Sequence, residues 1–132
     1  MQVTAFAGEF EPAYIVAVDV AGLQLFGPGT IDWAQKSDLC IDHHASHSHY
    51  ADGLVLDGTA AACAEIIYKL LLEMGAEITP FIASCLYTGM ATDTGCFKYS
   101  NVTFKTHLIA SQLYDYNIDA KKEYGYISGL SY

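Results

Sequence analysis

Arginine is absent from this sequence, and charged residues of either sign are few. All six basic residues are lysines, against fifteen acidic residues, and the formal net charge is −9. Proteins that bind long nucleic-acid duplexes usually carry a basic stripe rich in arginine. The composition therefore argues against a long duplex as a partner. It does not exclude a small phosphorylated ligand, because bound cations can supply positive charge locally.

Long apolar runs and paired cysteines are lacking as well. No run approaches the roughly 18 residues of a membrane span, and the N-terminus lacks the basic start and apolar core of a signal peptide. We therefore expect a cytoplasmic protein with no membrane partner. The four cysteines, Cys40, Cys63, Cys85 and Cys96, form no CxxC pair. In a cytosolic setting we expect free thiols that pack as small apolar residues.

Apolar side chains, by contrast, are plentiful. The 132 residues are 52% hydrophobic and 16% charged, which is more apolar and less charged than an average soluble domain. This length fits one domain with a substantial core.

Short apolar runs come first along the chain. Residues 14–18 form a continuous run that ends at Asp19, and this pattern predicts a strand buried on both faces, as in a parallel sheet. Residues 39–41, which end at Asp42, and residues 54–56 predict two more strands. A turn at residues 27–29 precedes a short predicted helix that starts at Thr30 or Asp32 and runs through Lys36.

Helical patterns dominate the second half. Thr59 is the expected N-cap of a helix that stops at Gly75, with apolar positions at Cys63, Ile66, Ile67, Leu70, Leu71 and Met74. Thr79 and Pro80 predict the start of a second helix, with apolar positions at Phe81, Ile82, Cys85, Leu86 and Met90. Further helices are expected at about residues 104–114 and from Asp119. Together these elements predict a three-layer α/β domain with a mainly parallel sheet. Ligands of such sheets lie beyond the carboxyl ends of the strands, where Asp19 and Asp42 are expected.

Four of the five histidines lie within seven residues of one another, directly after Asp42: His43, His44, His47 and His49. Imidazoles combined with carboxylates suit divalent ions such as Mn, Fe or Zn. From spacing alone, a metal site and a polar loop with incidental histidines are equally supported. Two acids have alternatives of their own: Asp93, among small residues, also fits a helix-terminating turn, and Asp19 also fits a turn or an N-cap.

Three motifs in order carry a family resemblance: Ala17-Val18-Asp19, Ile41-Asp42-His43-His44, and residues 86–100 with Asp93 near their centre. Residues 57–65 resemble the helix start found between the second and third motifs. The sequence resembles the DHH phosphoesterase superfamily from about residue 13 to residue 120. The branch that it resembles most is the bacterial oligoribonuclease and phosphoadenosine-phosphate phosphatase group.

The resemblance implies a phosphoesterase that hydrolyses short oligonucleotides or small nucleotides with two divalent ions, usually Mn²⁺. It implies Asp19, His43 and Asp93 as metal ligands, with Asp19 bridging both ions. It implies His44 and Asp42 as catalytic residues, with His44 facing the substrate phosphate and Asp42 fixing loop geometry or an imidazole tautomer. Lys98 is a second candidate for contact with phosphate, with a solvated lysine as the alternative.

Residues 1–12 hold neither the histidine nor the aspartates of the family's first motif, and its C-terminal substrate-binding domain has no counterpart here. We therefore expect a partial DHH domain over residues 1–132, truncated at both ends, that retains one or none of the family's two Mn²⁺ ions and forms homo-oligomers through surfaces exposed by truncation. The alternative is an inactive remnant that binds at most one ion or self-associates. Surface or loop roles are expected for His47 and His49. Core or interface packing rather than nucleobase stacking is expected for Tyr114, Tyr116, Tyr124, Tyr126 and Tyr132.

Overall fold

The computed structural model describes residues 12–27, 29–119, 121–122 and 125. The chain divides into two compact units, Met1–Asp57 and Gly58–Tyr132. The predicted helix from Asp119 lies mostly outside the described residues, as do Tyr124, Tyr126, Tyr132 and nearly all of the segment before Ala13.

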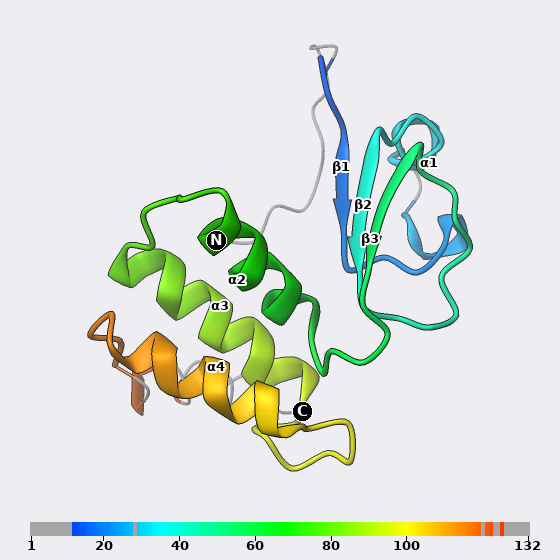
Figure 1. Ribbon diagram of the computed structural model, residues 1–132. Helices are drawn as coiled ribbons and strands as arrows, with labels where there is room; N and C mark the ends of the chain where they lie inside the picture. The colour runs from blue at the N-terminus through cyan, green and yellow to red at the C-terminus, as the bar shows by residue number, and fades with distance from the viewer. Residues whose placement is uncertain (1–11, 28, 120, 123–124, 126–132) are drawn as a thin grey trace. The chain divides into compact units, whose positions relative to one another are not determined.

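The first unit contains a three-stranded parallel sheet with strand order β1-β2-β3 (Figure 1). The strands are β1 (Val16–Val18), β2 (Leu39–Asp42) and β3 (Gly53–Leu56). A short 3-10 helix, η1 (Leu23–Leu25), and the helix α1 (Ile31–Ala34) occur in the connection between β1 and β2. The predicted α/β class and parallel sheet are confirmed; the three-layer arrangement stays a prediction.

Strand β2 is the centre of this sheet, and its last three residues are buried. Strand β1 is different, because Ala17 is buried but Val16 and Val18 are each 46% exposed. Successive side chains of a strand point to opposite faces, so only one face of β1 is covered. The prediction that this strand is buried on both faces is therefore wrong. Among the described residues β1 is an edge strand, and the predicted self-association stays a prediction.

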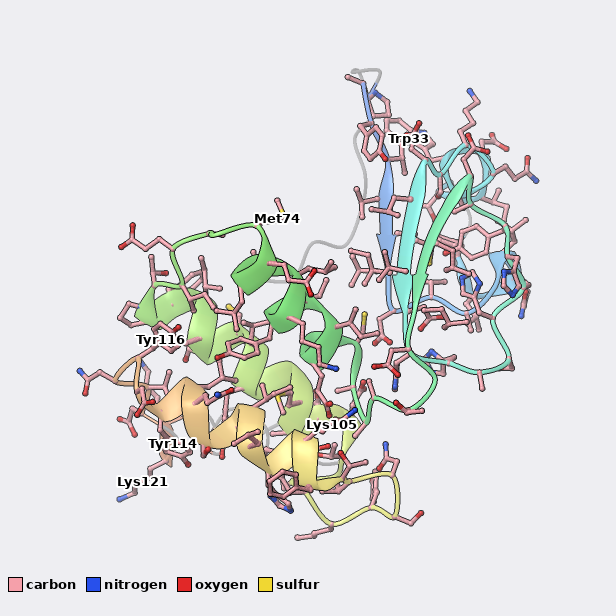
Figure 2. All side chains as sticks on the ribbon, in the orientation of Figure 1. Trp33, Met74, Lys105, Tyr114, Tyr116 and Lys121 are labelled. Atoms are coloured by element: carbon pink, nitrogen blue, oxygen red, sulfur yellow. The ribbon has the colours of Figure 1, made fainter. Side chains whose placement is uncertain are left out.

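The second unit consists of three packed helices, α2 (Cys63–Glu73), α3 (Pro80–Asp93) and α4 (Phe104–Tyr114). Helix α3 lies between the other two (Figure 1). Its buried side chains include Leu86 and Met90, which join a hydrophobic core shared by the three helices. Tyr116 packs against this core, and Tyr114 is half-exposed at the end of α4 with its hydroxyl 3.2 Å from that of Tyr87 (Figure 2).

The helix starts test the predicted caps. Helix α3 begins as expected, with Pro80 in its first turn and the Thr79 hydroxyl accepting the Ile82 N–H at 3.3 Å. The N-cap of helix α2 is Ala62, three residues after the predicted Thr59, and its side chain makes no capping hydrogen bond. Glu65, in the first turn, instead accepts the N–H of Ala61, which precedes the helix, at 3.2 Å.

Some apolar residues of these helices are exposed to solvent. Met74 and Phe81 are each 77% exposed, and Cys85 is exposed. All four thiols are free, as expected, but only Cys40 and Cys63 are buried. No helix in the described part of the chain has the length and apolar character needed to cross a membrane.

Replacing Thr79 by Ala should lower the free energy of unfolding by about 1 kcal/mol, because the Ile82 N–H loses its capping acceptor. Urea unfolding followed by circular dichroism measures the change. Thr92→Ala is the matched control, since the Thr92 hydroxyl only bonds carbonyls of its own helix and Ala is the better helix former. Equal loss of stability in both variants would contradict the capping role.

Candidate metal centre

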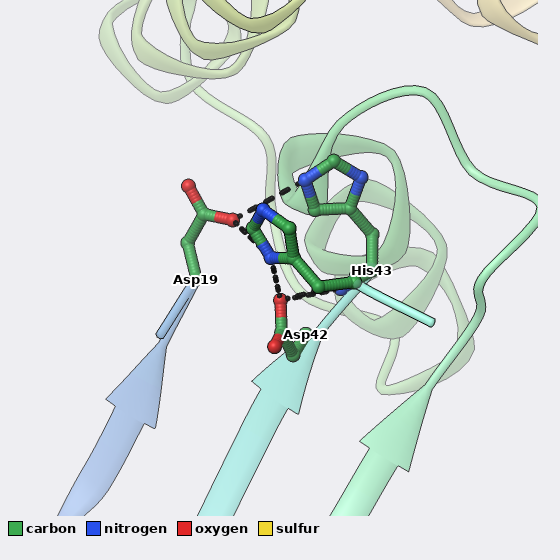
Figure 3. Close-up of side chains that lie close together, drawn as sticks. Asp19, Asp42 and His43 are labelled. Carbon is green, nitrogen blue, oxygen red and sulfur yellow. Dashed lines mark hydrogen bonds and ion pairs between the residues drawn. The ribbon is translucent and has the colours of Figure 1, made fainter. Parts of the chain in front are cut away.

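Two neighbouring parallel strands place an acidic side chain each at their carboxyl ends, on the same side of the sheet. Asp19 directly follows β1, and Asp42 is the last residue of β2 (Figure 3). The Asp19 N–H donates to the Ile41 carbonyl at 2.9 Å and so continues the β1–β2 ladder by one residue. The register of the sheet therefore fixes where the Asp19 side chain starts.

The backbone at Asp19 is strained. Its φ is 62°, in the left-handed region that residues with a side chain seldom occupy. Such conformations cost on the order of 1–3 kcal/mol and persist where the surrounding structure determines them; they cluster at functional sites. Aspartate tolerates this region better than most residues, which suits it to turning a carboxylate out of a strand end.

Asp42 is fully buried and organises the start of the next loop. Its Oδ1 atom accepts three hydrogen bonds: from the His43 N–H at 2.7 Å, the His44 N–H at 3.2 Å and the His44 ring Nδ1 at 2.7 Å. Burial by itself would raise the pKa of Asp42, but these bonds, first that of the His44 side chain, lower the pKa below its ordinary value. A carboxylate is therefore present to accept all three.

The bond to Asp42 also settles the tautomer of His44. Because Asp42 is an acceptor, the proton of a neutral His44 ring is on Nδ1, and Nε2 carries the lone pair. The His44 side chain is 44% exposed, whereas that of His43 is 12% exposed. His44 therefore presents its Nε2 on the more open side of the site, and His43 is held closer to the protein.

One ligand atom from each of Asp19, Asp42, His43 and His44 lies within 4.8 Å of the others. His43 Nε2 is 3.4 Å from Asp19 Oδ1 (Figure 3). Two ligands at about 2.1 Å from one ion are roughly 3.0–3.4 Å apart, so this pair fits a shared divalent ion with little movement. Carboxylate and imidazole donors are those that Mn, Fe and Zn accept. Because Asp42 Oδ1 already accepts three hydrogen bonds, we interpret Asp42 as the residue that orients His43 and His44.

The other two predicted site residues belong to the second unit. Asp93 is the last residue of α3 and is partly exposed; Lys98 is exposed in the turn that follows. Between them, Gly95, Cys96 and Phe97 all have positive φ, from 55° to 62°. Glycine adopts this conformation readily, but it is costly for Cys96 and Phe97, which marks this turn as unusual. The roles of Asp93 and Lys98 stay predictions.

The burial of the His47 side chain was not expected from the sequence. A surface or loop role was expected, but its side chain is fully buried, with Nε2 3.2 Å from Cys40 Sγ and 3.9 Å from Asp42 Oδ2. His47 does lie in the loop after β2, as expected, but a surface role is wrong for it because its side chain is buried, whereas His49 is exposed. No sequence pattern shows which histidine of a polar loop turns inward, because the choice depends on contacts with another strand.

Comparison with known proteins gives several relatives that are named as bifunctional oligoribonucleases and PAP phosphatases. The sequence is 39% identical over 114 residues to the probable bifunctional oligoribonuclease and PAP phosphatase of Streptococcus mutans, an alignment that covers 84% of this chain and 36% of the relative. It is 32% identical over 110 residues to the bifunctional oligoribonuclease and PAP phosphatase of Bacillus subtilis, covering 81% and 35%. The chain thus spans about a third of the length of these relatives. No family model matches the sequence.

A solved structure agrees with these relatives. The crystal structure of an exopolyphosphatase-related protein from Bacteroides fragilis matches 89% of this chain and 36% of that protein, with a TM-score of 0.77 and 26% identity. The sequence and the fold therefore agree. The chain belongs to the DHH phosphoesterase family, with the bifunctional oligoribonuclease and PAP phosphatases among its relatives.

Proposed function

We propose that this chain is a metal-dependent phosphoesterase domain that hydrolyses phosphoester bonds of short oligonucleotides or small nucleotides. One observation carries the proposal: the close group of ligand atoms from Asp19, Asp42, His43 and His44 at the carboxyl ends of two parallel strands. The names of the relatives support the substrate class, since they are oligoribonucleases and PAP phosphatases.

In this proposal Asp19 and His43 hold a divalent ion, with Mn²⁺ as the expected metal. Ions bound in such sites generate a hydroxide nucleophile at neutral pH and neutralise phosphoryl oxygens. Asp93 is a further ligand by family resemblance. Asp42 keeps the His43 and His44 backbone and the His44 ring in place through its Oδ1 atom.

His44 is proposed to contact the substrate. With its Nδ1–H bonded to Asp42, its exposed Nε2 accepts a hydrogen bond when neutral and donates one to a phosphate oxygen when protonated. Lys98 is a second proposed phosphate contact, from the second unit, and no long duplex is expected as a substrate, given the net charge of −9.

The test is hydrolysis by the purified chain with Mn²⁺ or with EDTA. Substrates are a two- to five-nucleotide oligoribonucleotide, phosphoadenosine phosphate and a linear dinucleotide of the kind that cyclic dinucleotides yield. We expect Mn²⁺-dependent release of mononucleotide or phosphate from at least one substrate, abolished by EDTA. A chain that turns over none of them and binds at most one ion would instead fit the inactive-remnant alternative.

A further inference from the structure

Next to Asp42 lies a group of buried and half-buried polar side chains that the proposed chemistry does not use. It consists of Cys40 on β2 and of His47 and Tyr50 in the loop after β2. The His47 ring stacks on Tyr50, with ring centroids 5.1 Å apart. The Tyr50 hydroxyl donates to the Val20 carbonyl at 3.0 Å, so this group also connects the loop after β1.

The protonation of His47 follows from its contacts. The backbone N–H of His49 donates to His47 Nδ1 at 2.9 Å, so Nδ1 carries the lone pair. The proton of the ring is therefore on Nε2. His47 Nε2 lies 3.2 Å from Cys40 Sγ, within hydrogen-bond distance, and 3.9 Å from Asp42 Oδ2, just beyond it. Asp42 Oδ2 is thus the nearby oxygen that a small movement would bring to this donor.

The carboxylate oxygen has the greater need for this proton. Asp42 Oδ2 is buried and has no hydrogen-bond partner among the described residues, whereas Oδ1 of the same carboxylate accepts three bonds. A buried charged oxygen without a donor is costly. The Cys40 sulfur is only a weak acceptor, and burial, helped by the nearby Asp42 charge, raises the pKa of this thiol, which keeps it neutral.

We propose that His47 is a positioning residue whose Nε2–H donates a hydrogen bond to Oδ2 of Asp42. This bond keeps the carboxylate oriented so that Oδ1 accepts from the His43 and His44 backbone and from the His44 ring. His47 touches neither substrate nor metal in this role. It acts through Asp42, as a donor to the carboxylate that orients two residues of the site. The effect on hydrolysis rests on the proposed function, whereas the effect on the His44 ring does not.

Two substitutions separate the atoms of His47. In His47→Asn the side-chain oxygen takes the place of Nδ1 and still accepts the His49 N–H, but no donor reaches Asp42. In His47→Gln the terminal amide takes the place of Nε2 and retains a donor toward Asp42. Cys40→Ala removes the competing acceptor and leaves Asp42 as the partner of the His47 N–H.

The first readout is the imidazole tautomer in the metal-free chain, from long-range ¹H–¹⁵N spectra. In the wild type we expect His47 protonated on Nε2 and His44 on Nδ1. His47→Asn should shift His44 toward a mixture of tautomers, and His47→Gln and Cys40→Ala should leave it on Nδ1. A wild-type His47 protonated on Nδ1 would overturn the proposal without any variant. The proposal would also be overturned if the His44 tautomer were unchanged in His47→Asn, or if Cys40→Ala shifted the His44 tautomer as much as His47→Asn does.

The second readout is Mn²⁺-dependent hydrolysis. Loss of a residue that supports the ligands typically lowers activity or metal affinity by roughly 10- to 100-fold, and we expect a loss of this size for His47→Asn, with recovery in His47→Gln. Equal losses in the two variants would show a packing role instead. If the wild type itself turns over no substrate, the proposed function fails, and the tautomer of His44 still decides the role of His47.

Discussion

Replacing Asp19 by Asn is expected to lower Mn²⁺-dependent hydrolysis by more than roughly 100-fold. Losing a residue that only supports the ligands costs about 10- to 100-fold, and a direct ligand should cost more. Asp19 Oδ1 lies 3.4 Å from His43 Nε2 and 3.8 Å from His44 Nδ1, so its charge faces both imidazoles. The amide of Asn keeps the shape of the side chain and removes the charge that attracts a divalent ion.

Asp52→Asn is the matched control for this variant. Asp52 is an exposed acid of the same unit, so the substitution makes the same change in net charge away from the site. Steady-state rates over a range of Mn²⁺ concentrations should show normal turnover for Asp52→Asn. Turnover in Asp19→Asn that equals turnover in Asp52→Asn would remove Asp19 from the site.

Glu65→Ala should lower the free energy of unfolding by about 2–4 kcal/mol, the second large effect. Glu65 is 1% exposed, and its Oε1 accepts the Ala61 N–H at 3.2 Å and the Thr106 hydroxyl at 2.8 Å. Thr106 is itself fully buried in the first turn of α4. The carboxyl group thus joins the starts of α2 and α4, and each buried donor left without its acceptor costs about 1–3 kcal/mol.

Urea unfolding followed by circular dichroism measures this loss. Glu65→Gln retains an oxygen acceptor and should lose less stability than Glu65→Ala. Glu73→Ala, at the exposed end of the same helix, should change stability by no more than about 0.5 kcal/mol. Glu65→Ala and Glu73→Ala variants of equal stability would show that the buried contacts of Glu65 contribute nothing.

The sequence anticipated the sheet edge because simple rules govern it. Short apolar runs that end in an acid predict parallel strands with carboxylates at one edge, and Asp19 and Asp42 lie there. The loop that starts with His43 and His44 follows Asp42 directly, so the polypeptide itself brings these groups together. The placement of these residues therefore follows from short sequence patterns.

The sequence did not anticipate what depends on contacts between distant residues. Helix α2 starts at Cys63 rather than after Thr59, and Glu65 in its first turn accepts hydrogen bonds from the Ala61 N–H before the helix and from Thr106 of α4, 41 residues away. His47 turns inward because Cys40, on a strand, and Tyr50 surround its ring. The apolar pattern that includes Phe81 predicts a helix, but the pattern does not show which face of the helix is buried.

We propose that Asp19 and His43 hold a divalent ion, in a group of ligand atoms completed by Asp42 and His44. The most direct measurement is a titration of the ¹⁵N-labelled chain with substoichiometric Mn²⁺, whose unpaired electrons broaden the signals of nearby amides. We expect the amides around Asp19 and residues 42–44 to broaden first, and Asp19→Asn to prevent this. Broadening confined to exposed acids elsewhere, or none at all, would contradict it.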